Sequence, residues 1–205
     1  MSERNNFEHR VSELIEESIA AKQSLLRSTA VISTVAQVSH ILIDGLEEGK
    51  KALLFGNGGS AADAQHIAAE LVGRFAFDRP PLPALALSVN SSCVTAIGND
   101  YGFDQIFSRQ IEALGHAGDT AIGISTSGNS ANVLNGLLVA KKMGLRTVAL
   151  AGRTGGELKN VVDYCICVPS DETPRIQECH ILIGHIISEL VERKIFNEAR
   201  HISRS

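Results

Sequence analysis

The sequence lacks tryptophan and contains few other aromatic residues, which together make up 4% of the chain. Proteins that bind single-stranded nucleic acid stack bases on aromatic side chains, and most nucleic-acid-binding proteins carry a basic patch or stripe. This chain has a formal net charge of -4, and no basic stripe is evident in it. The composition therefore argues against nucleic acid as a partner.

The four cysteines lack the CxxC spacing of a zinc or redox motif. Two of them alternate within the apolar run YCICV, which is typical of small buried side chains in a reducing compartment. The N-terminal segment MSERNNFEHR has acidic residues and no apolar core, unlike a secretory signal. No apolar run approaches the ~20 residues that a membrane-spanning helix needs. We therefore expect a soluble, cytoplasmic protein that does not enter a membrane.

Proline is also scarce, with 5 residues against 18 glycines, in a chain of 205 residues that is 44% apolar. This composition suits a single α/β domain, residues 1–205, with a sizeable core. Residues 7–48 have the apolar spacing of two helices. Part of their apolar surface could cover a sheet and part could pack in an oligomer, although an ordinary core helix gives the same pattern.

Five short apolar runs alternate with helical or turn segments along the rest of the chain. This alternation predicts a three-layer α/β sandwich, with a five-stranded parallel sheet covered on both faces and preceded by the N-terminal helices. In such folds ligands bind at the carboxyl ends of the strands. The expected strands are 52–55, 84–89, 120–124, 146–150 and 164–168, and the expected helices include a short one from 90 and longer ones over 103–114, 131–143 and 174–196.

A glycine-rich turn, GNGGS, follows the first expected strand and leads into a helix. The unpaired amides at a helix start carry partial positive charge, so this arrangement suits a phosphate group. On that helix His66 and Glu70 are four residues apart and project from one face. An exposed pair of little energetic weight is the alternative, but the apolar neighbours indicate a largely buried helix. We interpret the stretch as a site for chemistry on a phosphorylated small molecule.

The same turn formally satisfies the dinucleotide fingerprint G-x-G-x-x-G/A. The second expected strand, ALALSV, is followed by no acidic residue that could hold a ribose hydroxyl. The hypothesis of a nicotinamide dinucleotide site therefore lacks its second requirement, an acidic residue after the second strand.

A second loop, residues 125–130, places four hydroxyl groups within six residues before another helix. Such a loop offers hydroxyl donors and free amides to a phosphate. An ordinary helix cap would need only one hydroxyl, which accounts for Ser130 and leaves three others unexplained. We therefore read the loop as a phosphate site formed by Ser125, Thr126, Ser127 and Ser130.

Four segments together closely resemble the phosphoheptose isomerases of the sugar isomerase (SIS) domain superfamily. They are GNGGSAADAQHIAAEL, IGNDYGFDQIFSRQ, GISTSGNSANV and PRIQECHILIGHI. The resemblance covers nearly the whole chain and implies a flavodoxin-like SIS fold. It also implies an aldose-ketose isomerase that converts sedoheptulose 7-phosphate to D-glycero-D-manno-heptose 7-phosphate, for lipopolysaccharide and related glycans. Pro174 departs from the pattern, because some members have an acidic residue before RIQE.

The resemblance further implies the roles of individual residues. Glu70 and His185 would transfer the protons, and Asn99 and Asp100 would contact the sugar. The family forms homotetramers in which neighbouring chains complete each site. One zinc ion per subunit would be held by His66, Glu70, Gln177 and His185. The other substrate contacts would come from Asn57, Gly58, Gly59, Ser60, Glu70, Ser125, Thr126, Ser127, Ser130 and Gln177.

The last helix offers two histidines, and spacing does not settle between them. His180 lies three residues after Gln177, whereas His185 lies eight residues after it, a rise of about 12 Å. Spacing slightly favours His180, while the resemblance selects His185. The two histidines are five residues apart, which corresponds to about 140° around the helix, so we do not expect both of them to face the same site. A core histidine with a satisfied hydrogen bond is the alternative for either one.

The predicted reaction moves a carbonyl between C1 and C2 through an enediol. A carboxylate base, Glu70, and an imidazole acid, His185, suit this proton transfer, and a metal ion could polarise the carbonyl. A side chain bound tightly to zinc carries protons poorly, so either the ion shifts or one role is wrong. The alternative is a non-catalytic SIS-domain protein that binds a replication initiator, which would have no chemical reason to keep this pair.

Overall fold

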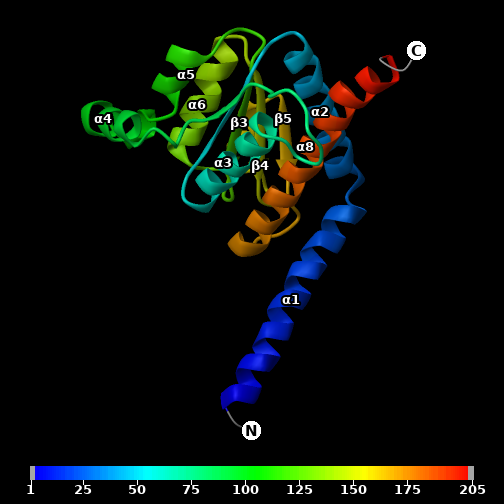
Figure 1. The fold of residues 1–205 in the computed structure, drawn as a ribbon. Helices are drawn as coiled ribbons and strands as arrows, with labels where there is room; N and C mark the ends of the chain where they lie inside the picture. Colours follow the sequence, from blue (N-terminus) through cyan, green and yellow to red (C-terminus); the bar gives the residue numbers. More distant parts are fainter. Residues whose placement is uncertain (1–2, 203–205) are drawn as a thin grey trace.

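The protein contains a five-stranded sheet between layers of helices, with one long helix extending away from the body (Figure 1). The structure, a computed structural model, describes residues 3–202 and the side chains of residues 6–196. The elements are α1 (Glu3–Arg27), α2 (Thr29–Glu47), β1 (Ala52–Gly56), α3 (Gly59–Val72), β2 (Ala84–Ala86), α4 (Ser91–Tyr101), η1 (Phe103–Gln105), α5 (Ser108–Leu114), β3 (Thr120–Ser125), α6 (Ala131–Lys142), β4 (Arg146–Ala151), α7 (Leu158–Val161), β5 (Tyr164–Cys167) and α8 (Thr173–Ile202).

The strands lie in the order β2-β1-β3-β4-β5, and all neighbouring pairs are parallel. This is the flavodoxin-like order, so the predicted α/β sandwich is confirmed. Strands β1 and β3 are buried along their whole length, as expected for central strands covered on both faces. Gly56, the last residue of β1, pairs with Ile124, one residue before the end of β3, so the loops that follow the two strands emerge side by side.

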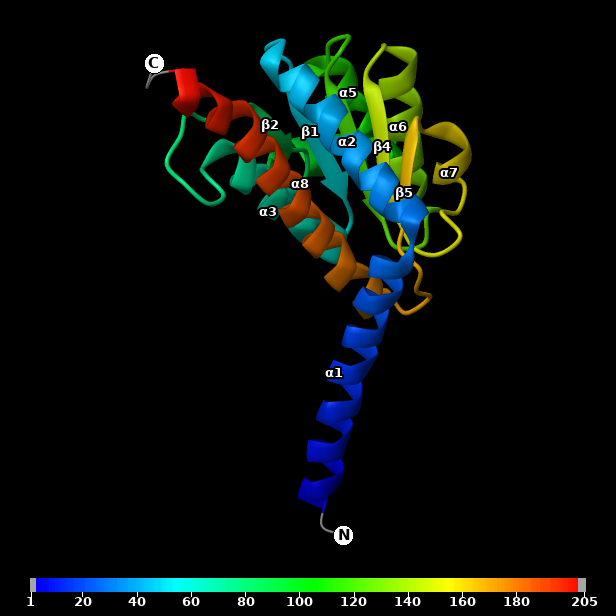
Figure 2. The ribbon, with the colours of Figure 1, turned by 90° about the vertical axis from the view of Figure 1, so that its right-hand side faces the viewer.

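Alternate residues of the strands supply two cores, one on each face of the sheet. Leu54 and Ile122 pack with α2, α3 and α8, while Leu53 and Phe55 pack with α5, α6 and α7. Figure 2 shows α2 and α8 in front of the sheet and α6 behind it. Helix α2 has the length and apolar composition of a membrane-spanning helix, yet it packs on α8 and β5 as a core helix does.

Helix α1 projects from the body as a nearly isolated rod in the views of Figures 1 and 2. Most of its large apolar side chains therefore remain in solvent in a single chain, including Phe7 with 74% of its surface exposed, while Ala21 and Leu25 at its end join the core. The exposed apolar residues of this helix are Phe7, Val11, Leu14, Ile15, Ile19 and Leu26.

Several boundaries differ from those predicted from the sequence. Strand β2 stops at Ala86, since the chain turns there and the Asn90 side chain caps α4. Helix α4, by contrast, ends at Tyr101, within the expected stretch 98–102, before Gly102, whose φ of 92° favours glycine. The expected helix over 103–114 divides into η1 and α5, and the short helix α7 was not predicted.

Candidate active site

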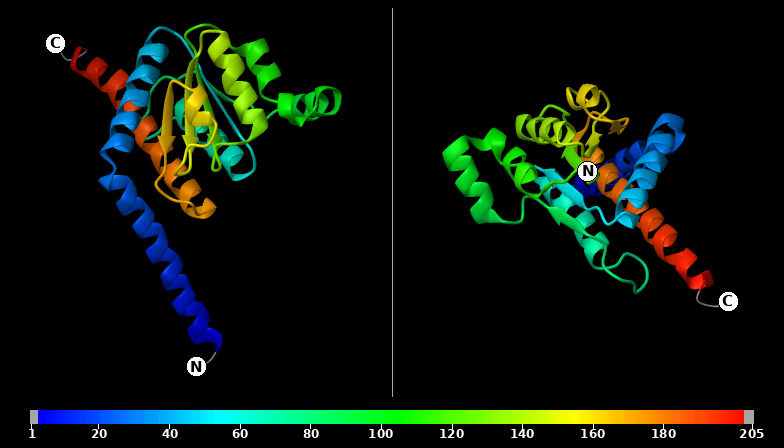
Figure 3. Two further views of the ribbon diagram at one scale, coloured as in Figure 1. Left: turned by 180° about the vertical axis from the view of Figure 1, so that it is seen from behind. Right: turned by 90° about the horizontal axis from the view of Figure 1, so that it is seen from above.

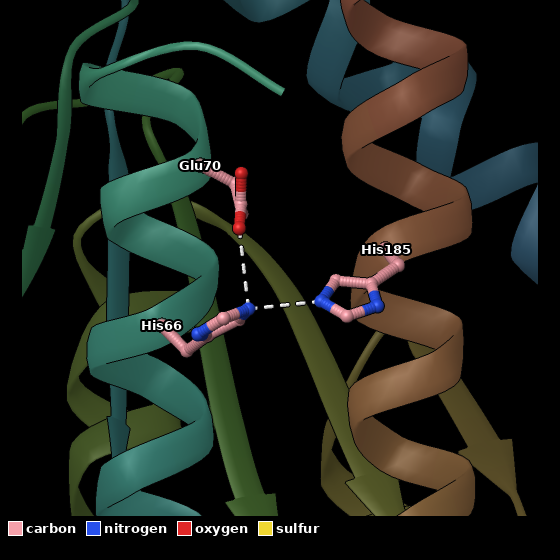
Figure 4. A group of neighbouring side chains, drawn as sticks. All are labelled: His66, Glu70 and His185. Carbon is pink, nitrogen blue, oxygen red and sulfur yellow. Dashed lines mark hydrogen bonds and ion pairs between the residues drawn. The ribbon is translucent and has the colours of Figure 1, made fainter. Parts of the chain in front are cut away.

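His66 and Glu70 of α3 face His185 of α8 (Figure 4). His66 Nε2 lies 2.8 Å from His185 Nε2 and 3.2 Å from Glu70 Oε1. One ligand atom from each residue lies within 4.8 Å of the others. The His66 and Glu70 side chains keep 49% and 22% of their surface exposed, so solutes can reach the cluster.

Glycine at position 184 allows α3 and α8 to approach closely enough for this contact. A Cβ atom at Gly184 would lie 2.5 Å from Ile67, the residue that follows His66. A side chain there would force Ile67 to move or the two helices to separate. The helices pack against each other along the same face of the sheet (Figure 2).

The cluster fits a zinc ion by its chemistry. Two imidazole nitrogens and one carboxylate oxygen are the ligand types of catalytic zinc sites, which keep one position open for water or substrate. Zinc-ligand bonds of about 2.0–2.1 Å in a tetrahedron place neighbouring donor atoms about 3.3 Å apart. The observed separations around His66 Nε2, 2.8 and 3.2 Å, are of this order.

His180 lies in the core and not in the cluster. Its side chain is fully buried, and Nε2 is 3.3 Å from the Ala151 carbonyl oxygen. Burial lowers the pKa of His180 to about 4, and the Ala151 contact opposes this only in part. Of the two histidines left open by the spacing, the structure places His185 beside His66 and keeps His180 neutral in the interior.

Gln177, a residue of α8, lies against the start of α3. A Cβ atom on Gly59 would collide with the Gln177 side-chain amide, so that amide covers the first turn of the helix. His66 is seven residues further along α3, a rise of about 10 Å. In a single chain, Gln177 therefore lies beside the glycine loop, and its role as a fourth metal ligand stays a prediction.

The hydroxyl groups of the serine loop, residues 125–130, gather at the end of β3. Ser125 Oγ is 2.9 Å from Ser130 Oγ and 3.4 Å from Ser127 Oγ. Ser130 is the N-cap residue of α6, but its side chain makes no capping hydrogen bond. The helix-cap explanation therefore does not account for the Ser130 hydroxyl. Thr126, also in this loop, is half-buried.

The glycine loop, residues 56–60, is fixed to α6 beside the serine loop. Asn57 and Asn132 donate reciprocal side-chain hydrogen bonds of 2.8 and 2.9 Å. Gly58 has a φ of 53°, which favours glycine, while Ser60 is buried in the first turn of α3. The two predicted phosphate loops are thus neighbours at the carboxyl edge of the sheet.

Asn99 and Asp100 lie away from these groups. Both are exposed near the end of α4, where Asn99 Nδ2 donates to Asp100 Oδ1 at 2.8 Å. Helix α4 stands out from the body on the side away from α8 in both views of Figure 3. A single chain does not bring this pair to the cluster around His66.

Three features were missed from the sequence. Asn132 follows the serine loop and could have been noticed as a polar residue in an apolar helix. Asp63 lies one turn before His66, and burial raises its pKa to about 6, opposed by the His66 charge. Arg79 and Glu192 form a buried ion pair of 2.9 Å, and no local pattern links two residues so far apart in sequence.

Comparison with known proteins identifies the family of this fold and site. The SIS domain family profile matches residues 11–152. A phosphoheptose isomerase of Sulfurimonas denitrificans is 55% identical over 188 residues, which cover 92% of this chain and 96% of that protein. The chain belongs to the phosphoheptose isomerases of the SIS domain family.

Solved phosphoheptose isomerase structures agree with this chain over nearly their whole length. The Neisseria gonorrhoeae enzyme superposes with a TM-score of 0.85 at 43% identity, covering 91% of this chain and 98% of that one. The Francisella tularensis protein gives 0.87 at 37% identity, covering 94% and 100%. The predicted resemblance to the phosphoheptose isomerases is therefore confirmed.

Proposed function

We propose that this protein isomerises sedoheptulose 7-phosphate to D-glycero-D-manno-heptose 7-phosphate. The observation that carries this is the convergence of three side chains: His66 and Glu70, on the helix that begins at the glycine loop, and His185 of α8. The phosphoheptose isomerases at 55% identity support the same reaction. The non-catalytic, initiator-binding alternative is not favoured, because relatives at 55% identity are named phosphoheptose isomerases.

The spacing of the site suits a seven-carbon sugar phosphate. The phosphate would bind the amides of the glycine loop and the hydroxyls of the serine loop. From Gly59 to His66 the α3 helix rises about 10 Å. An open-chain heptose phosphate has a similar reach, since six carbon-carbon bonds of about 1.5 Å join C1 to C7. Its C1 and C2 would then lie beside Glu70 and His185.

Glu70 removes a proton from C1, and His185 donates a proton to the oxygen at C2, giving an enediol. Return of a proton to C2, with loss of the hydroxyl proton from the oxygen at C1, completes the aldose. The imidazole and carboxylate face each other across His66, so both can reach adjacent carbons of one substrate. This assignment is part of the proposal, as are the sugar contacts of Asn57, Gly58, Gly59, Ser60 and Gln177.

We also propose that the cluster binds one zinc ion per subunit through His66, Glu70 and His185, with Gln177 as the fourth ligand. The donor atoms of His66, Glu70 and His185 already lie within 4.8 Å of one another, whereas Gln177 of the same chain lies beside the glycine loop. When bound, zinc would act as a Lewis acid toward the substrate carbonyl. Asp63 lies one turn before His66 on α3, and its carboxylate would support that imidazole through its charge.

The protein acts as a cytoplasmic homotetramer in this proposal, as one domain whose helices over 7–48 pack against other copies. The exposed apolar stripe of α1 supports this, because a single chain leaves it in solvent. An apolar groove of about 260 Å³ between α1, α2 and α8 extends that surface. Asn99 and Asp100 would then reach the site of a neighbouring chain.

A turnover assay tests the function directly. Purified protein is incubated with sedoheptulose 7-phosphate, and the aldose product is followed with Glu70→Gln as the control variant. The proposal expects aldose from the parent protein and none from Glu70→Gln. No aldose from the metal-loaded parent protein would favour the binding-protein alternative, and equal turnover in Glu70→Gln would remove the base assignment.

A further inference from the structure

Strand β5 carries two cysteines that the proposed isomerase chemistry does not use. Cys165 and Cys167 are two residues apart, so their side chains leave the strand on the same face. Their Sγ atoms lie 3.5 Å apart. Both residues are only partly buried, whereas Cys179 is buried.

We propose that Cys165 and Cys167 form a reversible oxidation site, which hydroperoxides convert from a dithiol to a disulfide. We also propose that forming this disulfide weakens phosphate binding at the serine loop. The oxidation site stands on the cysteine geometry alone. The effect on phosphate rests on the proposed function.

Cys167 is the sulfur that reacts first. The hydrogen bond from Cys165 lowers the pKa of the Cys167 thiol to about 7, and the Lys159 ammonium acts in the same direction against burial. The same shared hydrogen bond and burial raise the pKa of Cys165. Cys167 is therefore partly thiolate near neutral pH while Cys165 keeps its proton, a pairing typical of reactive cysteines.

The chemistry has two steps. The Cys167 thiolate attacks the terminal oxygen of the hydroperoxide, so that an S–O bond forms and the O–O bond breaks. The Cys167 side chain becomes a sulfenic acid, and the remaining oxygen leaves as an alcohol or water after protonation. The Cys165 thiol then attacks the sulfenic sulfur, and water leaves as the S–S bond forms. Two electrons pass from the two sulfurs to the hydroperoxide, and a thiol reductant reverses the change.

Closing the disulfide has to distort the end of β5. Two residues of a strand span about 6.6 Å, near the upper limit of the Cα separations that disulfides allow. The strand must therefore bend to bring the sulfurs into bonding distance. Strained disulfides of this kind are readily reduced, which suits a reversible site.

The distortion is linked to the serine loop through the segment 152–158. Cys167 pairs with Ala151, the last residue of β4, and a Cβ on Gly155 would lie only 3.0 Å from Cys167 Sγ. Movement of Cys167 therefore displaces this segment. The segment donates three hydrogen bonds to the serine loop: from Gly152 N to Thr126 O (3.0 Å), from Leu158 N to Gly128 O (3.1 Å) and from Glu157 N to Asn129 Oδ1 (2.9 Å).

Peptide mass spectrometry tests the oxidation site without any assay of activity. Trypsin cleaves after Lys159 and Arg175, so residues 160–175 form one peptide with Cys165 and Cys167 as its only cysteines. After hydrogen peroxide treatment and alkylation, we expect this peptide to lose two hydrogens and to regain both thiols with dithiothreitol. Two alkylated thiols in that peptide, at peroxide doses that oxidise Cys93 or Cys179, would overturn the proposal.

Single variants separate the two steps. Cys165→Ser should stop at a sulfenic acid on Cys167, trapped by dimedone, and Cys167→Ser should leave Cys165 unmodified at the same dose. Cys93→Ser should behave as the parent protein does. Dimedone adducts at equal rates in Cys165→Ser and Cys167→Ser would contradict the assignment of Cys167 as the reactive sulfur.

Calorimetric binding of inorganic phosphate tests the coupling. We expect the oxidised parent protein to bind phosphate at least about fivefold more weakly than the reduced one, and peroxide to leave a Cys165→Ser/Cys167→Ser double variant unchanged. Equal affinity in the two states of the parent protein would overturn the coupling. Absence of phosphate binding by the reduced protein would overturn the phosphate site, and the peptide result would still decide the oxidation site.

Discussion

Arg79 joins the buried carboxylate of Glu192 to the backbone of the turn that carries Glu70. Arg79 Nε donates to Glu192 Oε2 at 2.9 Å, and Nη2 donates to the Glu70 carbonyl oxygen at 2.8 Å. The two side chains are only 2% and 1% exposed. The end of α3 is thereby fixed to α8, the helix that supplies His185.

Glu192→Gln should lower the free energy of unfolding by about 3–5 kcal/mol, because it leaves the Arg79 guanidinium buried without its counter-charge. It should also lower kcat by shifting the last turn of α3 relative to His185. Urea unfolding and turnover measure the two effects. Glu189→Gln on the same helix removes an exposed pair with Arg193 and should change stability by less than about 0.5 kcal/mol. Similar losses in both variants would contradict the role of the buried pair.

Gly184→Ala should lower zinc content and stability together. The added methyl group would lie 2.5 Å from Ile67 and would separate His66 from His185. We expect a cost of about 1–3 kcal/mol from this overpacking. Gly98→Ala is the control, since its Cβ would lie 3.7 Å from the nearest neighbour, Ile106, in a helix that favours alanine. Metal analysis that finds full zinc in Gly184→Ala would show that close helix contact is not required.

Ser125→Ala should raise KM for sedoheptulose 7-phosphate by about 10-fold or more, with a smaller effect on kcat. Its hydroxyl lies between those of Ser127 and Ser130, and a hydrogen bond to a charged group contributes about 1.5–3 kcal/mol. Thr34→Ala, whose hydroxyl donates only to its own helix at Ala30, should leave KM unchanged. An unchanged KM in Ser125→Ala would place the phosphate elsewhere.

His180 should make the protein less stable as the pH falls from about 6.5 to 4. Burial lowers its pKa to about 4, so between these values the unfolded chain binds a proton that the folded chain excludes. This contribution to stability is complete above pH 6.5, and about 3 kcal/mol of it is lost by pH 4. His180→Gln should flatten this part of the stability profile, whereas the exposed His116→Gln should not. Equal slopes in His180→Gln and the parent protein would contradict the assignment.

The sheet and the positions of the two loops at its carboxyl edge could be predicted from the sequence because each depends on local signals; their role in phosphate binding stays a prediction. Apolar runs such as 120–124 mark buried strands, and the glycines and hydroxyls that follow them mark loop ends. The pairing of His66 with His185 could not be derived from spacing, since it depends on how α3 and α8 pack. The buried Arg79 and Glu192 pair was missed for the same reason, because residues 113 positions apart meet only in the folded chain.

The central claim is that Glu70 moves a hydrogen between C1 and C2 of the bound sugar phosphate. NMR of the reaction in deuterated water measures this directly, because an enediol takes up solvent deuterium at C2 of the aldose. We predict deuterium at C2 with the parent protein and none with Glu70→Gln, whose fold and phosphate binding are checked in parallel. Deuterium uptake by folded Glu70→Gln at the parent rate would contradict the account.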